Sequence, residues 1–140
     1  MEDNTEDQIE EFCTRFFNVR DVQESQAGFS EFRTICQSRI IDKLISKAIE
    51  SKEADARLVG DLFSELVANE LCSQACFEEG FMPTAEWLDD IVIDCPRAFE
   101  LMVMMMRGSA LDKDWHCYSR IAARSKHNND FVALLLWKPV

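Results

Sequence analysis

The chain has 140 residues, and its 47% hydrophobic content is enough for one domain with a buried core. Its 26 acidic and 15 basic residues give a net charge of −11, which disfavours direct binding of nucleic acid and favours a basic protein partner. No apolar run is long enough to cross a membrane, and the acidic N-terminus lacks the regions of a signal peptide, so we expect an intracellular protein.

Apolar residues recur at helical spacing from the start of the chain. Thr5 followed by Gln8 forms a capping box that predicts the beginning of a first helix. The apolar stripe of this helix consists of Ile9, Phe12, Cys13, Phe16 and Phe17. Asp21 with Glu24 marks the start of a second helix, whose apolar stripe is weaker.

Two clear stripes follow and predict an antiparallel helical hairpin. The first consists of Ile40, Ile41, Leu44, Ile45, Ala48 and Ile49. The second consists of Leu58, Val59, Leu62, Phe63, Leu66 and Val67. The charged link Ser51–Asp55 is short, so the two helices are expected to fold back on one another.

The second half of the chain also has helical spacing. A helix is predicted to begin near Ser73, and Pro83 should kink it or split it in two. Pro96 is expected to open the next helix, which ends at Gly108. The run Met102–Met106 within this helix is interpreted as core, because a helix that is apolar on all sides is usually buried.

A seventh helix is predicted from about Asp114 to Arg124, followed by a polar loop at 125–130 and an apolar run at 131–137. No segment alternates with period two, so the predicted fold class is all-α, with stacked antiparallel helical hairpins like those of HEAT and armadillo repeats. We expect a single domain over residues 1–140, with a flexible N-terminal lead at 1–6. The pattern does not define the structure of the terminal segment 125–140, for which a helix at 131–137 is the favoured interpretation.

The six cysteines do not indicate a catalytic or metal site. Their positions favour buried thiols in a reducing compartment over a disulfide framework. A zinc site built from Cys72, Cys76, His116 and Cys117 would have a spacing that matches no common structural site. No glycine-rich oxyanion segment accompanies a cysteine, so we expect no enzyme, no metal and no cofactor.

The segment LDDIVIDCPRA, residues 88–98, predicts the end of one helix, a short bend and the start of another. Asp90 and Asp94 are four residues apart, and Asp94 is expected to cap the helix that Pro96 opens. Two interpretations stay open at this point. The aspartates are binding residues mounted on a rigid turn, or they are capping groups and solvated charge.

The segment FEEGFMPTAEWLDDIVIDCPRAFELM, residues 77–102, resembles the signature half of the MA-3 (MA3) domain, which occurs in the family of eukaryotic initiation factor 4G and programmed cell death protein 4. The matching positions are Phe77, Glu78, Gly80, Phe81, Leu88, Asp89, Asp90, Asp94 and Pro96. Residues 45–71 resemble the central hairpin of the family and residues 9–24 its opening helix. The resemblance therefore covers nearly the whole chain.

This resemblance implies a non-catalytic interaction module that docks on the DEAD-box RNA helicase eukaryotic initiation factor 4A and regulates translation initiation, alone or in a larger initiation complex. It implies that Asp90 and Asp94 meet arginines of the helicase, whose guanidinium groups suit paired carboxylates. The partner-binding residues that it implies are Asp89, Asp90, Asp94, Pro96 and Arg97. Arg97 either completes the polar contact or anchors the corner internally, and both alternatives stay open.

The expected location is the cytoplasm, with the nucleus as a further location, and neither nucleic acid nor a membrane is expected to bind directly. A second function also stays open: a generic helical-repeat adaptor for another protein or peptide, in which the aspartates are only caps. An enzyme with a cysteine nucleophile ranks third.

Overall fold

The computed structural model describes residues 6–124, which form seven α-helices and one 3-10 helix and contain no strand. This result confirms the all-α prediction. The elements are α1 (Glu6–Val19), α2 (Val22–Ser30), α3 (Thr34–Ile49), α4 (Glu53–Ala68), α5 (Gln74–Asp94), α6 (Ala98–Gly108), η1 (Leu111–Lys113) and α7 (Trp115–Ala122). Most of the N-terminal lead, the capping residue Thr5 and the terminal segment at 125–140 lie outside the described residues.

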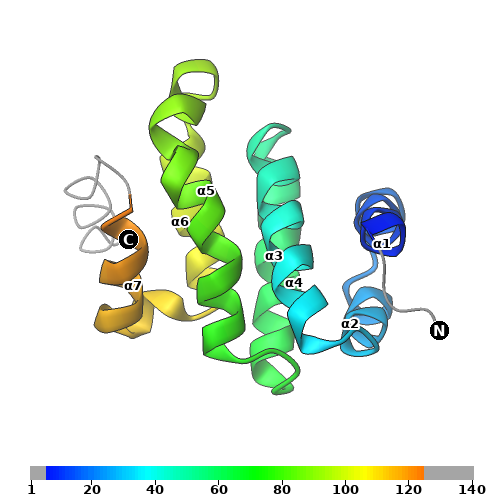
Figure 1. Ribbon diagram of the computed structural model, residues 1–140. Coiled ribbons are helices and arrows are strands. Elements are labelled where there is room, and N and C mark those ends of the chain that lie inside the picture. The colour runs from blue at the N-terminus through cyan, green and yellow to red at the C-terminus, as the bar shows by residue number, and fades with distance from the viewer. Residues whose placement is uncertain (1–5, 125–140) are drawn as a thin grey trace, which may run out of the picture.

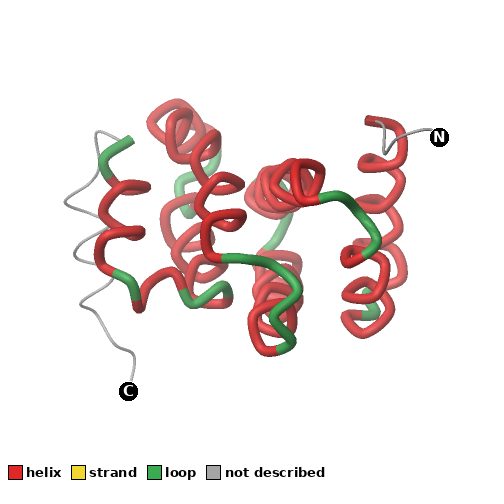
Figure 2. The backbone as a smooth tube through the Cα atoms, turned by 60° about the horizontal axis from the view of Figure 1, so that its bottom comes forward, coloured by secondary structure: helices red, strands yellow, loops and turns green. Residues whose placement is uncertain are grey.

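The helices are stacked in successive pairs along one direction. Helices α1 and α2 lie at one end of the stack, α3 and α4 form the next layer, α5 and α6 follow, and α7 covers the other end (Figure 1). The turned view shows the same order of layers (Figure 2). The layers pack mainly through α3 against α5 and through α4 against α6. The predicted stack of helical hairpins is thus confirmed.

Side-chain caps begin several helices at the predicted places. The Asp21 carboxylate accepts a hydrogen bond from the Glu24 N–H at 3.1 Å, which starts α2. The Ser73 hydroxyl accepts from the Cys76 N–H at 3.1 Å, which starts α5, and Asp114 caps α7 in the same manner. Each cap satisfies backbone N–H groups that have no partner within their own helix.

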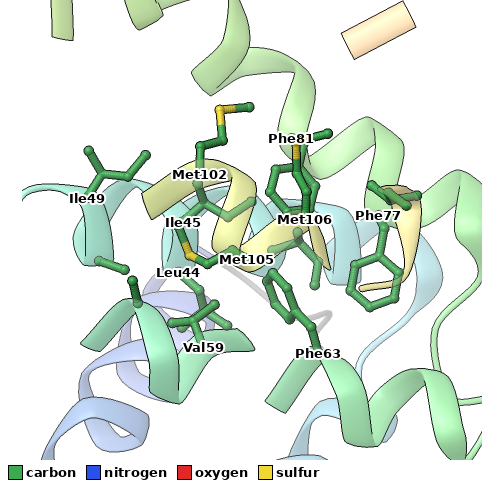
Figure 3. Close-up of a cluster of buried hydrophobic side chains, with 14 of the residues drawn as sticks. Leu44, Ile45, Ile49, Val59, Phe63, Phe77, Phe81, Met102, Met105 and Met106 are labelled. Atoms are coloured by element: carbon green, nitrogen blue, oxygen red, sulfur yellow. The ribbon is translucent and has the colours of Figure 1, made fainter. Parts of the chain in front are cut away.

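The core lies between the two central layers, where side chains from α3, α4, α5 and α6 meet (Figure 3). Phe63 of α4 packs edge-on against Phe77 and Phe81 of α5, with ring centroids 5.1 and 6.0 Å apart. From α6, Met102, Met105 and Met106 are completely buried in this cluster. The methionine run is therefore core, as predicted.

The two main contacts between layers each require a glycine. A Cβ atom placed on Gly80 of α5 would lie 2.5 Å from the Cβ atom of Ile41 on α3. A Cβ atom on Gly108 of α6 would lie 2.5 Å from the carbonyl oxygen of Gly60 on α4. Such distances are impossible for real side chains, so the missing side chains allow the helices to approach closely.

Helix α5 is not split at Pro83, which corrects one of the two outcomes expected from the sequence. The helix runs without interruption from Gln74 to Asp94 with Pro83 inside it. Proline removes one hydrogen bond from a helix interior, at a cost of about 3 kcal/mol. Phe81, Ala85 and Leu88 on either side of it are completely buried, so packing of α5 on its neighbours offsets this cost. No helix of the described part has the length and apolar character needed to span a membrane.

We predict that Gly80→Ala lowers the free energy of unfolding by about 1–3 kcal/mol, because the new methyl group would collide with Ile41 and force α3 and α5 apart. Urea unfolding followed by circular dichroism measures this. The matched control is Gly28→Ala, where the new Cβ would lie 3.3 Å from the end of the Phe12 ring, which can shift. The control should be neutral or stabilising by up to about 1 kcal/mol, and equal effects of the two variants would contradict the proposed close contact.

A second prediction concerns Thr84, whose buried hydroxyl has no hydrogen-bond partner among the described residues. Thr84→Val should leave the free energy of unfolding unchanged or raise it by about 1 kcal/mol, because it removes an unsatisfied polar group of nearly the same shape. Ser109→Ala is the control, since the Ser109 hydroxyl is also buried but donates to the Met106 carbonyl oxygen at 2.8 Å. Destabilisation of the two variants by similar amounts in the same unfolding assay would argue that Thr84 is bonded after all.

Candidate protein-docking site

The junction between α5 and α6, which we call the acidic corner (residues 89–97), lies at the upper edge of the α5–α6 layer in Figure 1. Asp90, Asp94, Pro96 and Arg97 are exposed to solvent there, and Asp89 is half-buried. The structure thus brings together all the partner-binding residues implied by the resemblance, on one helix end and the turn that follows it.

The corner is a tight turn whose details differ from the prediction. The Ala98 N–H donates to the Cys95 carbonyl oxygen at 2.9 Å, and Arg97 has φ −90° and ψ 8°. These values, with Pro96 in the second position, are those of a type I turn. Helix α6 therefore begins at Ala98 and not at Pro96, and no side chain caps it. The prediction that Asp94 caps α6 is wrong, because Asp94 is the last residue of α5.

The carboxylates of Asp90 and Asp94 occupy an electrostatically unfavourable position. Asp94 is the last residue of α5 and Asp90 lies one turn before it, close to the helix end where unpaired carbonyl groups give partial negative charge. Within residues 6–124, neither carboxylate forms a hydrogen bond or an ion pair with another side chain. The two charges therefore gain no pairing from residues 6–124, and a cation from outside this region would relieve their repulsion.

Many other carboxylates of the domain are paired. The ion pairs include Glu6–Arg39, Glu10–Lys43, Glu10–Lys47, Glu24–Arg15, Asp55–Arg20, Glu78–Arg120 and Glu86–Arg124. These pairs occupy most of the basic side chains of the described region. The corner is thus a place where negative charge stays available at the surface.

Arg97 forms ion pairs with two side chains of its own domain, which favours internal anchoring among the two alternatives for this residue. Its Nη1 atom lies 2.8 Å from Glu53 Oε1, and its Nε atom lies 2.8 Å from Glu100 Oε1. Glu53 is the first residue of α4, so this contact ties the corner to the neighbouring layer. Hydrogen bonds from Arg97 and Arg57 hold the pKa of the Glu53 carboxyl below its ordinary value.

Glu78 of the signature segment has a structural role. Its carboxylate accepts hydrogen bonds from Arg120 Nε at 2.6 Å and Arg120 Nη2 at 2.8 Å, and from the Cys117 thiol at 2.8 Å. These bonds fasten α5 to α7, and those from Arg120 chiefly lower the pKa of the Glu78 carboxyl. The signature therefore combines residues that build the frame with a corner that faces solvent.

Four of the six cysteines are buried, and Cys72 and Cys95 are half-buried. Burial raises the pKa of Cys13 to about 12, and burial together with the Glu78 carboxylate raises that of Cys117 to about 12. A hydrogen bond with Cys76 is the main cause of a raised pKa at Cys72. In the described part of the chain, no group of three or more histidine, cysteine or acidic residues is placed to hold a metal ion.

Two exposed apolar residues on α5, one before the corner and one within it, are not among the binding residues predicted from the sequence. Trp87 is 63% exposed and Ile93 is 76% exposed, although both lie on α5 close to the aspartates. Ile91 and Val92, which stand with Ile93 between the two aspartates, are half-buried. The available signal was the helical period, because Trp87 lies outside the inward stripe of Phe77, Phe81, Ala85 and Leu88.

We predict that Glu78→Gln lowers the free energy of unfolding by about 1 kcal/mol near neutral pH, because two charged hydrogen bonds to Arg120 become weaker. The pKa of Glu78 is lower in the folded than in the unfolded chain, so its contribution is complete above the unfolded value of about 4.5 and is lost as the pH falls through the folded value. Urea unfolding at several pH values should therefore show that the free energies of unfolding of the variant and of the unaltered chain become equal as the pH falls.

Glu86→Gln is the matched control for this experiment, since Glu86 and its partner Arg124 are both about half exposed. We expect little effect of this exposed pair at any pH. A difference between Glu78→Gln and the unaltered chain that stays constant from neutral to acidic pH would contradict the role assigned to the Glu78 carboxylate.

A comparison with protein-family models finds one match, to the model described as the MA3 domain, over residues 5–115. The match extends from the residue before α1 to the first residue of α7 and so includes the acidic corner. Neither the curated proteins nor the solved structures that were searched contain a match to this chain.

Proposed function

The chain belongs to the MA3 domain family, a family of helical protein-interaction modules in translation-related proteins, and we propose that it binds a DEAD-box RNA helicase of the eukaryotic initiation factor 4A type through its acidic corner. The binding regulates translation initiation, alone or within a larger initiation complex. MA3 is not a known enzyme fold, so the proposed activity is recognition without catalysis. The proposed location is the cytoplasm, where initiation takes place, and the nucleus is a further location.

The observation that carries this proposal is the pair of exposed carboxylates without partners among residues 6–124. Asp90 and Asp94 are one helical turn apart, a spacing at which Cβ atoms on a helix surface are about 5–6 Å apart. Guanidinium groups bind carboxylates through two parallel hydrogen bonds, so a partner surface with arginines fits this pair well. The type I turn and the contact between Arg97 and Glu53 hold the carboxylates in place before the partner arrives. A preformed site loses less conformational entropy on binding.

The charge of the whole chain supports the same kind of partner. A net charge of −11 attracts a basic surface from a distance and accelerates association, especially at low salt. The same charge repels the phosphates of RNA. Direct contact is therefore proposed with the protein part of a helicase and not with its nucleic acid.

The test is the double variant Asp90→Asn with Asp94→Asn, titrated against purified initiation factor 4A in a calorimeter. We expect the dissociation constant to rise by at least about tenfold, because two charged contacts are lost while side-chain shape is kept. The free energy of unfolding should stay unchanged or rise, since negative charge is removed from the end of α5. A clear loss of stability would instead support the view that these aspartates are caps.

The matched control is Asp61→Asn with Glu79→Gln, which removes two exposed acidic charges elsewhere on the domain. This control should bind nearly as well as the unaltered chain. If both double variants lose the same affinity, overall charge and not the corner is responsible. Full binding by the corner variant would favour a generic helical-repeat adaptor, whose partner docks on another surface.

A further inference from the structure

Helix α5 presents an exposed stripe that extends beyond the acidic corner. Trp87, Asp90 and Asp94 are separated by three and four residues, so they lie next to one another on one face of the helix. Ile93 lies at the edge of this face, three residues after Asp90. All four side chains are exposed. We call these residues the α5 stripe.

The stripe contrasts with the rest of the domain. Large apolar side chains of the central helices are mostly buried, and the ring contacts among the described aromatic residues do not include Trp87. A single exposed apolar residue is ordinary on a protein surface. Here, however, an exposed indole lies beside two carboxylates that have no partner among residues 6–124. This combination indicates a specific kind of ligand.

That ligand is an arginine on a protein surface. The edge of a guanidinium group donates hydrogen bonds to a carboxylate, while its flat face stacks on an indole ring. Lysine is a compact charge and satisfies only part of this arrangement. Neighbouring Glu86 is already paired with Arg124 at 2.9 Å, so the negative charge available on the stripe comes from Asp90 and Asp94. A phosphate-bearing partner would be repelled.

We propose that the α5 stripe is one docking face for a folded protein surface on which an arginine is flanked by apolar side chains. The guanidinium binds Asp90 and stacks on Trp87, Asp94 adds negative charge one turn further along α5, and Ile93 contacts the apolar side chains of the partner. This inference rests on the proposed function for the position of the interface, and it extends that interface from the turn along α5. It assigns to Trp87 the role of selecting arginine over lysine.

The first experiment measures binding of Trp87→Ala to purified initiation factor 4A. We expect a dissociation constant at least about tenfold higher, as for an aromatic residue at the centre of an interface, and a smaller loss for Trp87→Phe. Ile35→Ala is the matched control, because Ile35 is 67% exposed but lies on α3. If Trp87→Ala binds like the unaltered chain while the aspartate variant does not, the corner is correct and the extended stripe is wrong.

The second experiment needs no helicase. An acetylated peptide with three arginines and its lysine counterpart are titrated into the labelled protein, and the indole N–H signal of Trp87 is followed by NMR after assignment with Trp87→Phe. The arginine peptide should shift this signal more strongly than the lysine peptide, and the shift should disappear in the Asp90→Asn, Asp94→Asn variant. Equal shifts with both peptides, or no shift, would overturn the inference. If the helicase fails to bind the unaltered chain, the proposed function is wrong, and the peptide result still decides the role of the stripe.

Discussion

The close contact between α3 and α5 at Gly80 is the constraint on which the rest of the structure depends. Only a residue without a side chain allows the Ile41 side chain to come so near the backbone of α5. Because a helix is rigid, this contact also sets the rotation of α5 about its axis. Phe77 and Phe81 then face the core, and Asp90 is carried to the solvent side. The position of the proposed docking surface is thus determined by packing more than two helical turns away from it.

The signature segment contains residues that pack α5 into the core and residues that are exposed at its end. Phe77, Gly80 and Phe81 hold α5 in the core, and Glu78 fastens it to α7. At the far end, Asp94 has no side-chain partner in the described part of the chain and lies at the negative end of the helix dipole. A stable frame can tolerate such a local cost, and surfaces that bind partners are where costs of this kind are commonly found.

Local signals in the sequence predicted much of the fold, because capping and helical periodicity act over a few residues. The helix starts at Asp21, Ser73 and Asp114 are examples. The break at Pro83 did not occur, because burial on α3 and α6 outweighs one lost hydrogen bond. The charges of the corner were enough to predict that it is exposed. The ion pair of Arg97 with Glu53 could not be predicted from local sequence signals, because the two residues are 44 positions apart in the chain.

The contacts of Arg97 have a further consequence for the site beside it. Arg97 follows Asp94 by only three residues, and a guanidinium so close in a tight turn is a natural internal competitor for any cation that approaches from outside. Glu53 and Glu100 hold this side chain on both of its edges and keep it away from Asp94. These contacts keep Arg97 from neutralising Asp94, so the partner proposed above would not have to displace this arginine.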